Sequence, residues 1–101
     1  MNNKVLSTLG LARRAGRLNY GFDMVMAGLD KTHLLILAED VAPRTCRNAE
    51  QAAKEFGIPL KSLPVTKDQL GAGIGTKPVG IIGVADRGFA TLLAQSIEGG
   101  K

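Results

Sequence analysis

Two uninterrupted apolar runs constrain the fold of this chain more than any other feature. Residues 34–37 are all Leu or Ile, and residues 79–85 form a second stretch that contains only apolar residues and Gly. A strand with one face in water alternates apolar and polar residues, whereas a strand covered on both faces does not. We therefore predict two buried strands, at residues 32–38 and 79–85, with helices on both sides of the sheet.

The remaining segments show helical spacing or are short and extended, and Gly and Pro separate them. Residues 4–15 carry apolar residues at helical spacing, and Gly16 suits the end of that helix. Thr66 and Asp86 are residue types that cap helices. We predict further helices at residues 22–29, 43–56, 66–70 and 86–97, and short strands at residues 18–20 and 60–64.

Helices that alternate with strands predict the α/β class. The arrangement expected is a three-layer α/β/α sandwich with a small four-stranded mixed sheet. A chain of 101 residues, 45% of them hydrophobic, is long enough for one core and too short for two. We therefore expect residues 1–101 to form a single domain.

Several classes of protein are disfavoured by composition. No apolar run approaches the roughly 18 residues that a membrane span needs, and the N-terminal residues lack the pattern of an export signal. With one cysteine, Cys46, and one histidine, His33, neither an intrachain disulfide nor a Cys/His zinc site is expected. These features favour a cytoplasmic protein with no metal, no cofactor and no membrane partner.

Basic residues gather near the start of the chain. The net charge is +4, and residues 1–20 contain Lys4, Arg13, Arg14 and Arg17 but no acidic residue. Arginines near the end of a helix complement its dipole, which accounts for one or two of the three. A basic patch is also what a protein that binds phosphate backbones requires. Charge alone leaves both interpretations open.

Possible catalytic motifs are weak. The glycines of residues 71–75 lie after a predicted helix and before a strand, the reverse of the order in a dinucleotide-binding fingerprint. We expect them to form a loop with exposed backbone. Glu39 and Asp40 are adjacent carboxylates that we interpret as caps of the helix at residues 43–56. His33 and Cys46 lack matched partners in the sequence, so we do not expect an enzyme.

Four segments in register carry a resemblance to a known family. They are Leu-Gly-Leu-Ala-Arg-Arg-Ala-Gly-Arg at residues 9–17, Leu-Ala-Glu-Asp-Val-Ala-Pro at residues 37–43, Thr-Lys-Asp-Gln-Leu-Gly at residues 66–71 followed by Ile-Gly at 74–75, and Asp-Arg-Gly-Phe-Ala at residues 86–90. Over residues 6–93 the chain resembles the ribosomal protein L7Ae family, which binds kink-turn RNA, and in particular its small bacterial branch. The resemblance implies the same sandwich fold and an RNA partner, with possible association with the ribosome.

The resemblance also implies where RNA binds. The family reads RNA with a Gly-x-Asn-Glu pattern at the start of the second helix and with the loop before the last strand. Here the first stretch is Gly21, Phe22, Asp23 and Met24, with Ala27 where the family has Lys. Ionised Asp only accepts hydrogen bonds, whereas Asn also donates, and Met cannot pair with a base edge. The base-reading side chains therefore differ from those of the family.

Residues 76–79 are similar to the family's second RNA-binding segment, and Lys67 and Lys77 match commonly basic positions. Amides at the start of the second helix would attract anions whatever the side chains are, and the first helix ends just before them. The candidate RNA-binding residues are Arg13, Arg14, Arg17, Gly21, Phe22, Asp23, Met24, Lys67, Lys77, Pro78 and Val79.

The leading interpretation is a monomeric, non-catalytic protein that binds structured RNA, ribosomal RNA or another kink-turn-like RNA, in association with the ribosome. The alternative is a protein-interaction module that has kept the fold but lost specific recognition of kink-turns. Asp23, Met24 and Ala27 motivate that alternative. A small hydrolase or nucleotide enzyme is the third possibility, and the sequence offers no polar constellation for it.

Overall fold

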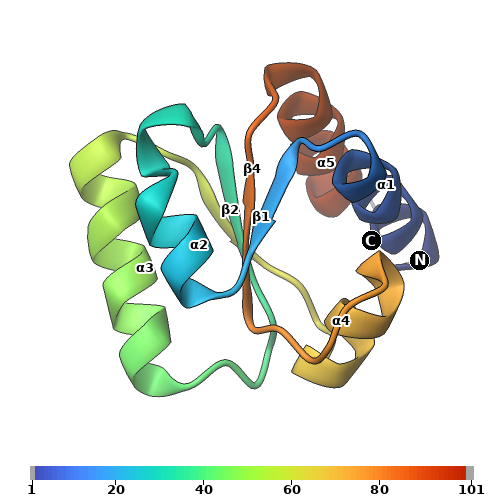
Figure 1. Cartoon of the computed structure of the whole chain (residues 1–101), viewed down its shortest axis with the longest axis horizontal. Helices are drawn as coiled ribbons and strands as arrows, with labels where there is room; N and C mark the ends of the chain where they lie inside the picture. The colour runs from blue at the N-terminus through green and yellow to red at the C-terminus, as the bar shows by residue number, and fades with distance from the viewer. Residues whose placement is uncertain (1, 100–101) are drawn as a thin grey trace.

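The computed structural model describes residues 2–99, in which helices and strands alternate along the chain (Figure 1). The helices are α1 (Asn2–Arg14), α2 (Phe22–Ala27), the short 3-10 helix η1 (Leu29–Lys31), α3 (Pro43–Phe56), α4 (Lys67–Ile74) and α5 (Arg87–Gly99). The strands are β1 (Leu18–Tyr20), β2 (Leu34–Leu37), β3 (Leu60–Ser62) and β4 (Ile81–Val84). No helix within this part of the chain is both long and apolar enough to span a bilayer.

The four strands form one mixed sheet in the order β1-β4-β2-β3. Strand β4 is antiparallel to both of its neighbours, with Val84 opposite Leu18 of β1 and opposite Leu34 of β2. Strands β2 and β3 run parallel, with Leu35 opposite Leu60. The two strands with continuous apolar sequence are therefore the two central ones.

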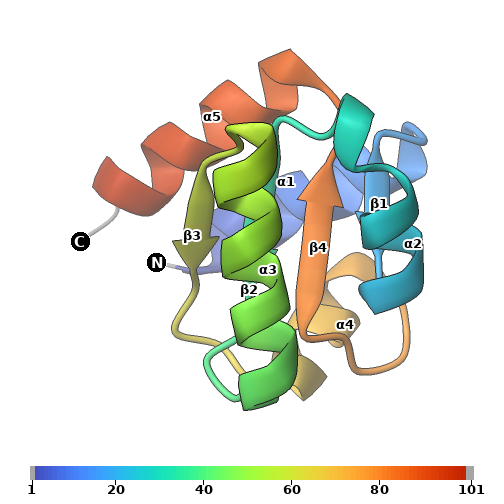
Figure 2. The same cartoon turned by 90° about the vertical axis from the view of Figure 1, so that its left-hand side faces the viewer.

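Helices cover both faces of this sheet. Helices α2 and α3 lie on one face, and α1, α4 and α5 lie on the other, with the sheet seen edge-on between them (Figure 1). The view turned by 90° shows α3 in front of the central strands (Figure 2). The predicted three-layer α/β/α sandwich with a small four-stranded mixed sheet is confirmed.

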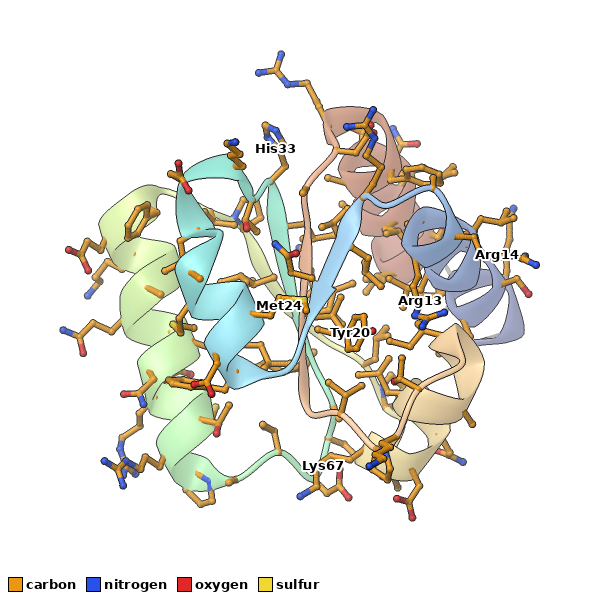
Figure 3. All side chains as sticks on the ribbon, in the orientation of Figure 1. Arg13, Arg14, Tyr20, Met24, His33 and Lys67 are labelled. Atoms are coloured by element: carbon orange, nitrogen blue, oxygen red, sulfur yellow. The ribbon has the colours of Figure 1, made fainter. Side chains whose placement is uncertain are left out.

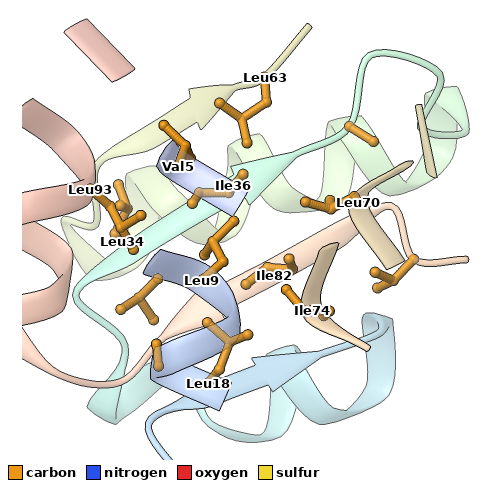
Figure 4. Packing of buried hydrophobic residues seen from close by; sticks show 14 of the residues in the cluster. Val5, Leu9, Leu18, Leu34, Ile36, Leu63, Leu70, Ile74, Ile82 and Leu93 are labelled. Atoms are coloured by element: carbon orange, nitrogen blue, oxygen red, sulfur yellow. The ribbon is translucent and has the colours of Figure 1, made fainter. Parts of the chain in front are cut away.

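Alternate residues of the central strands supply two separate cores. Leu34, Ile36 and Ile82 point toward α1, α4 and α5, where they pack with Leu9 and Leu93 (Figure 4). The intervening residues Leu35, Leu37 and Ile81 belong to the core under α2 and α3. Every residue of β2 and β4 is buried. Successive residues of a strand point to opposite faces, so burying both faces requires the continuous apolar runs in the sequence.

The glycine-rich segment differs from the prediction. Helix α4 was expected to end at Leu70 with an exposed loop after it, but it continues to Ile74 and ends at Gly75, which has φ of 82°. Gly71 is buried, and a Cβ built on it would overlap the carbonyl oxygen of Lys77. A Cβ on Gly73 would lie 2.9 Å from Leu6 of α1. These glycines therefore allow close packing inside a helix rather than forming a loop.

Smaller differences occur at the ends of other elements. Helix α1 ends at Arg14, and the predicted core residue Ala15 is exposed. Helix α2 ends at Ala27 rather than at Leu29, and the short η1 follows it, where the Oγ1 of Thr32 donates a hydrogen bond of 2.7 Å to the carbonyl of Gly28. Strand β1 has the predicted bounds, whereas β2, β3 and β4 are shorter than the predicted residues 32–38, 60–64 and 79–85.

Two of the predicted helix caps are confirmed, and a third acts on a different helix. Thr66 forms a reciprocal capping box with Gln69, and the Oδ1 of Asp86 accepts from the Phe89 amide at 2.8 Å. The prediction that Glu39 and Asp40 cap the following helix is wrong. Pro43 begins α3 without an N–H, whereas Asp40 Oδ1 accepts from the Lys67 amide at 2.8 Å, at the start of α4.

The substitution Gly71→Ala tests the close packing of α4 against the loop that follows it. Ala is favoured over Gly in a helix by about 1 kcal/mol. The overlap with Lys77 should outweigh this gain, so that the free energy of unfolding falls by about 1–3 kcal/mol. Urea denaturation measures the change. In the exposed control, Ala72→Gly, only the loss of helix propensity is expected; a Gly71→Ala protein as stable as the parent would contradict the packing described.

Candidate functional site

A hollow of about 320 Å³ lies where the end of β1 meets the loop between α4 and β4. We call it the Tyr20 hollow. The last turn of α1, the end of β1 and the α4–β4 loop contribute its walls. Its lining residues are Arg13, Tyr20, Gly21, Gly75, Thr76, Lys77, Pro78 and Val79.

Backbone geometry fixes the two loops that meet at this hollow. Gly21 has φ of 89°, a region that favours glycine, and there the chain turns from β1 into α2. The Gly21 amide donates to the carbonyl of Ile81 at 3.1 Å. On the other side, the Thr76 amide donates to Gly71 at 2.8 Å, and the Val79 amide donates to Lys67 at 3.2 Å. The α4–β4 loop is therefore attached to α4 near both ends of the helix.

Arg13 is the central charged residue of the hollow. Its guanidinium lies over the ring of Tyr20, with the Cζ 5.5 Å from the ring centroid (Figure 3). Its Nε is buried and has no hydrogen-bond partner within residues 2–99. A buried donor without a partner is costly, and a guanidinium that is stacked on one face keeps its donors in fixed directions. The arrangement suits an anionic or planar polar ligand.

The two lysines named from the sequence belong to different elements, Lys67 to α4 and Lys77 to the α4–β4 loop. Lys77 is exposed and lines the hollow. Lys67 begins α4, at the far end of the helix from Arg13 (Figure 3). The stem of Lys67 covers Gly80, since a Cβ built there would lie 3.3 Å from Lys67 Cδ. Pro78 and Val79 also line the hollow, whereas Lys67 does not.

The start of α2 contributes backbone more than side chains. Gly21 lines the hollow, whereas Phe22, Asp23 and Met24 are exposed and are not among its lining residues. Helix α2 has only six residues, and no side chain caps its N-terminus. A helix of less than two turns has a small dipole, so its amides provide a weaker anion site than the sequence suggested.

The three arginines predicted as one cluster separate in the structure. Arg13 lines the Tyr20 hollow. Arg14 lines a second hollow between α1 and α4, on the other side of Arg13 (Figure 3). Arg17 lines neither; its Nε lies 3.9 Å from Asp86 Oδ2. Arg17 therefore has an intramolecular partner at the start of α5.

Three lining residues were not singled out from the sequence. Tyr20, Gly75 and Thr76 complete the hollow, and two of them are held there by the unexpected extension of α4. Tyr20 carried a usable signal, because it is the only tyrosine and directly precedes Gly21 in an otherwise basic segment. The contact between Tyr20 and Arg13 depends on how α1 packs beside β1 and could not be read from spacing.

The charges at the hollow are of one sign. Its charged lining residues in the described part of the chain are Arg13 and Lys77, with no carboxylate among them. Within residues 2–99, no group of three His, Cys, Asp or Glu residues is placed to hold a metal ion. The chemistry available is cationic and aromatic binding together with backbone groups of the glycine turns.

Substitutions of Arg17 and Asp86 test whether Arg17 forms only a weak ion pair, unlike the arginines that line the hollows. Arg17→Ala removes only a partly exposed ion pair and should lower the free energy of unfolding by less than about 1 kcal/mol. Asp86→Ala also removes the cap of α5 and should lower it by about 0.5–2 kcal/mol. Urea denaturation of the single and double variants gives the coupling free energy between the two side chains. If Arg17→Ala lowered the free energy of unfolding as much as Asp86→Ala does, the description of Arg17 as a weak ion-pair partner would be contradicted.

Comparison with known proteins agrees with the observed fold and also identifies a family that the chain matches. Residues 3–94 match the ribosomal protein L7Ae/L30e/S12e/Gadd45 family. A protein of Enterococcus faecium named RNA-binding protein YlxQ is 29% identical, over 95% of this chain and 93% of its own length. The protein of the same name from Bacillus subtilis (strain 168) is 28% identical, over 89% of this chain and 91% of its own length.

Two solved structures share the architecture. A protein of unknown function from Bacillus halodurans C has a TM-score of 0.88 and 34% identity, covering 94% of this chain and 97% of that chain. A 15.5 kD RNA-binding protein of Giardia lamblia has a TM-score of 0.77 at 16% identity, covering 93% of this chain and 84% of that chain, and at this identity only the fold is shared. With nearly the whole length matched, the chain belongs to the ribosomal protein L7Ae/L30e/S12e/Gadd45 family.

Proposed function

We propose that residues 1–101 act as a single RNA-binding domain, without catalysis, and that structured RNA binds at the Tyr20 hollow. The observation that carries this proposal is Arg13, stacked over Tyr20 with a buried and unpartnered Nε, beside the exposed Lys77. The YlxQ relatives are named RNA-binding proteins, which supports the same class of ligand here.

Unpaired nucleotides fit this chemistry better than a regular duplex does. Proteins recognise RNA sequence mainly at loops and bulges, where unstacked bases lie on aromatic rings or guanidinium planes. The hollow offers both surfaces, and Lys77 supplies a cation for a neighbouring phosphate. Backbone at Gly21 and Gly75 lets a nucleotide come close, because no side chain stands there.

The RNA that we propose is a kink-turn-like internal loop, as found in ribosomal RNA, bound by a monomer in the cytoplasm in association with the ribosome. Asp23 and Met24 are exposed beside the hollow and cannot make the Asn and Glu contacts of the family. Recognition therefore relies on shape and on phosphates more than on base edges.

The direct test is a binding assay with two RNAs, a stem interrupted by a kink-turn internal loop and a continuous duplex of the same length. Tighter binding to the first is expected, and equal binding to both would contradict the proposal for kink-turn-like RNA. Failure to bind either RNA at low salt would overturn RNA binding itself. Sedimentation with ribosomal subunits at moderate salt tests the association with the ribosome.

Substitutions at the hollow test its role. Lys77→Ala should weaken binding about three- to tenfold, because one phosphate contact is lost. The salt slope, which is the slope of the logarithm of the binding constant against that of the salt concentration, should fall in magnitude by about 0.7–0.9. Arg13→Lys keeps the charge but loses the planar group, so affinity should fall without this change in slope. Arg47→Ala removes one charge from α3, on the opposite face of the sheet, and serves as the control. Equal losses for Lys77→Ala and Arg47→Ala would show nonspecific charge attraction instead.

A protein-interaction module is the second candidate, and one observation favours it. Phe22 and Met24, both in α2, have exposed fractions of 38% and 47%. Exposed apolar side chains of this size are typical of surfaces that contact protein partners. Capture of a partner that depends on Met24 and is insensitive to salt, by protein that binds neither RNA, would support this second function over the first.

A further inference from the structure

A second hollow, of about 530 Å³, lies between α1 and α4. We call it the α1–α4 hollow. Its lining includes Ser7, Leu11 and Arg14 from α1, and residues 72–75 from α4. Arg13 and Gly75 line this hollow and also the Tyr20 hollow. The two hollows are therefore neighbours that share one wall, and Arg13 stands between them.

The floor of the α1–α4 hollow is formed by backbone. Gly10 and Gly73 face each other where the helices approach, and a Cβ built on Gly10 would lie 3.2 Å from the carbonyl oxygen of Gly73. Because neither residue has a side chain, the two helices come close at this point. Most of the lining residues of the hollow are Gly, Ala or Ser, so a ligand there could come close to the polypeptide backbone.

The edges of this hollow are cationic and apolar. Arg13 and Arg14 are its charged lining residues, and neither forms an ion pair within residues 2–99. Leu11, which is 52% exposed, provides an apolar surface beside them. Two guanidinium groups without ion pairs, next to an apolar side chain, match the phosphate and the sugar or base of a nucleotide. No carboxylate in the described lining opposes an anion.

We propose that the α1–α4 hollow is a second RNA subsite, which binds unpaired nucleotides that continue from the RNA element held at the Tyr20 hollow. Arg14 contacts a phosphate of this flanking strand, Arg13 contacts the phosphate between the two subsites, and Leu11 packs against a sugar or base. This inference rests on the proposed RNA binding at the Tyr20 hollow. It adds that the preferred RNA carries a single-stranded segment next to its structured element.

The shared wall favours this occupant over a separate protein partner. Lys77 lines the Tyr20 hollow, Arg13 lines both hollows and Arg14 lines the α1–α4 hollow, so the cations follow one path across the surface. A polyanion with regularly spaced charges matches such a path, and each neutralised phosphate of a single strand adds about 0.7 to the salt slope.

The test uses the internal-loop stem described above in three forms: without a tail, and with a short tail of unpaired uridines on one strand or on the other. One tailed RNA is expected to bind more tightly than the untailed stem. Arg14→Ala should remove about three- to tenfold of affinity for that RNA and have a much smaller effect on binding of the untailed stem. The salt slope that the Arg14→Ala protein shows with the tailed RNA should be smaller than that of the parent by about 0.7.

A second variant keeps the arginines and changes the hollow itself. Ser7→Glu places a negative charge on the exposed α1 edge of the hollow and should abolish the gain from the tail. Gln51→Glu, at an exposed position of α3, makes the same change in net charge and is the matched control, with Arg47→Ala as the control for Arg14→Ala. Circular dichroism confirms that each variant is folded.

The outcomes separate the two proposals. If the untailed stem binds through Lys77 but neither tail adds affinity and Arg14→Ala behaves as the parent, the second subsite is overturned and the first stands. If no RNA binds, the proposed function fails and the inference fails with it. Titration with a short oligouridylate, followed by NMR, should shift the amides of Ser7, Gly10 and Gly73; shifts confined to Gly21 and Lys77 would also overturn the second subsite.

Discussion

The structure depends on the burial of its two central strands from both sides. Each large aliphatic side chain that leaves water contributes about 1.5–3 kcal/mol, and β2 and β4 supply side chains to the cores on both faces of the sheet. One layer of helices would leave half of them in water. The need to cover both faces places α1, α4 and α5 on one side and α2 and α3 on the other, and this placement brings the end of α1 beside the α4–β4 loop.

Most of the fold could be predicted because its main determinants are local. The unbroken apolar runs identified β2 and β4, and helical spacing identified α1, α3 and α5. The predictions were wrong where the local structure depends on a contact between residues far apart in the sequence. Asp40 caps α4 rather than α3, through a hydrogen bond between residues 27 apart in sequence. Gly71 and Gly73 lie inside a helix because close packing there leaves no room for a side chain. In the sequence alone, the same glycines predicted a loop.

The candidate site was predicted in outline and not in its details. Gly21, Lys77, Pro78 and Val79 lie together at one hollow, as the family resemblance implied. The arginines did not behave as one cluster. Consecutive helical residues point about 100° apart, and Arg13 lines both hollows whereas Arg14 lines only the α1–α4 hollow. Arg17 lies beyond the helix near Asp86. Which neighbour each arginine meets depends on the packing of α4 and α5, and that information is absent from the spacing of the arginines themselves.

The attachment of the α4–β4 loop to both ends of α4 has a kinetic consequence. Hydrogen bonds from Thr76 to Gly71 and from Val79 to Lys67 tie the loop to a helix that is itself packed against α1. A binding surface held in this way is already shaped before a ligand arrives, so little conformational entropy is lost on association. For the RNA that we propose, encounter would then require no slow opening or closing step, and we expect electrostatic attraction by Arg13 and Lys77 to govern the association rate.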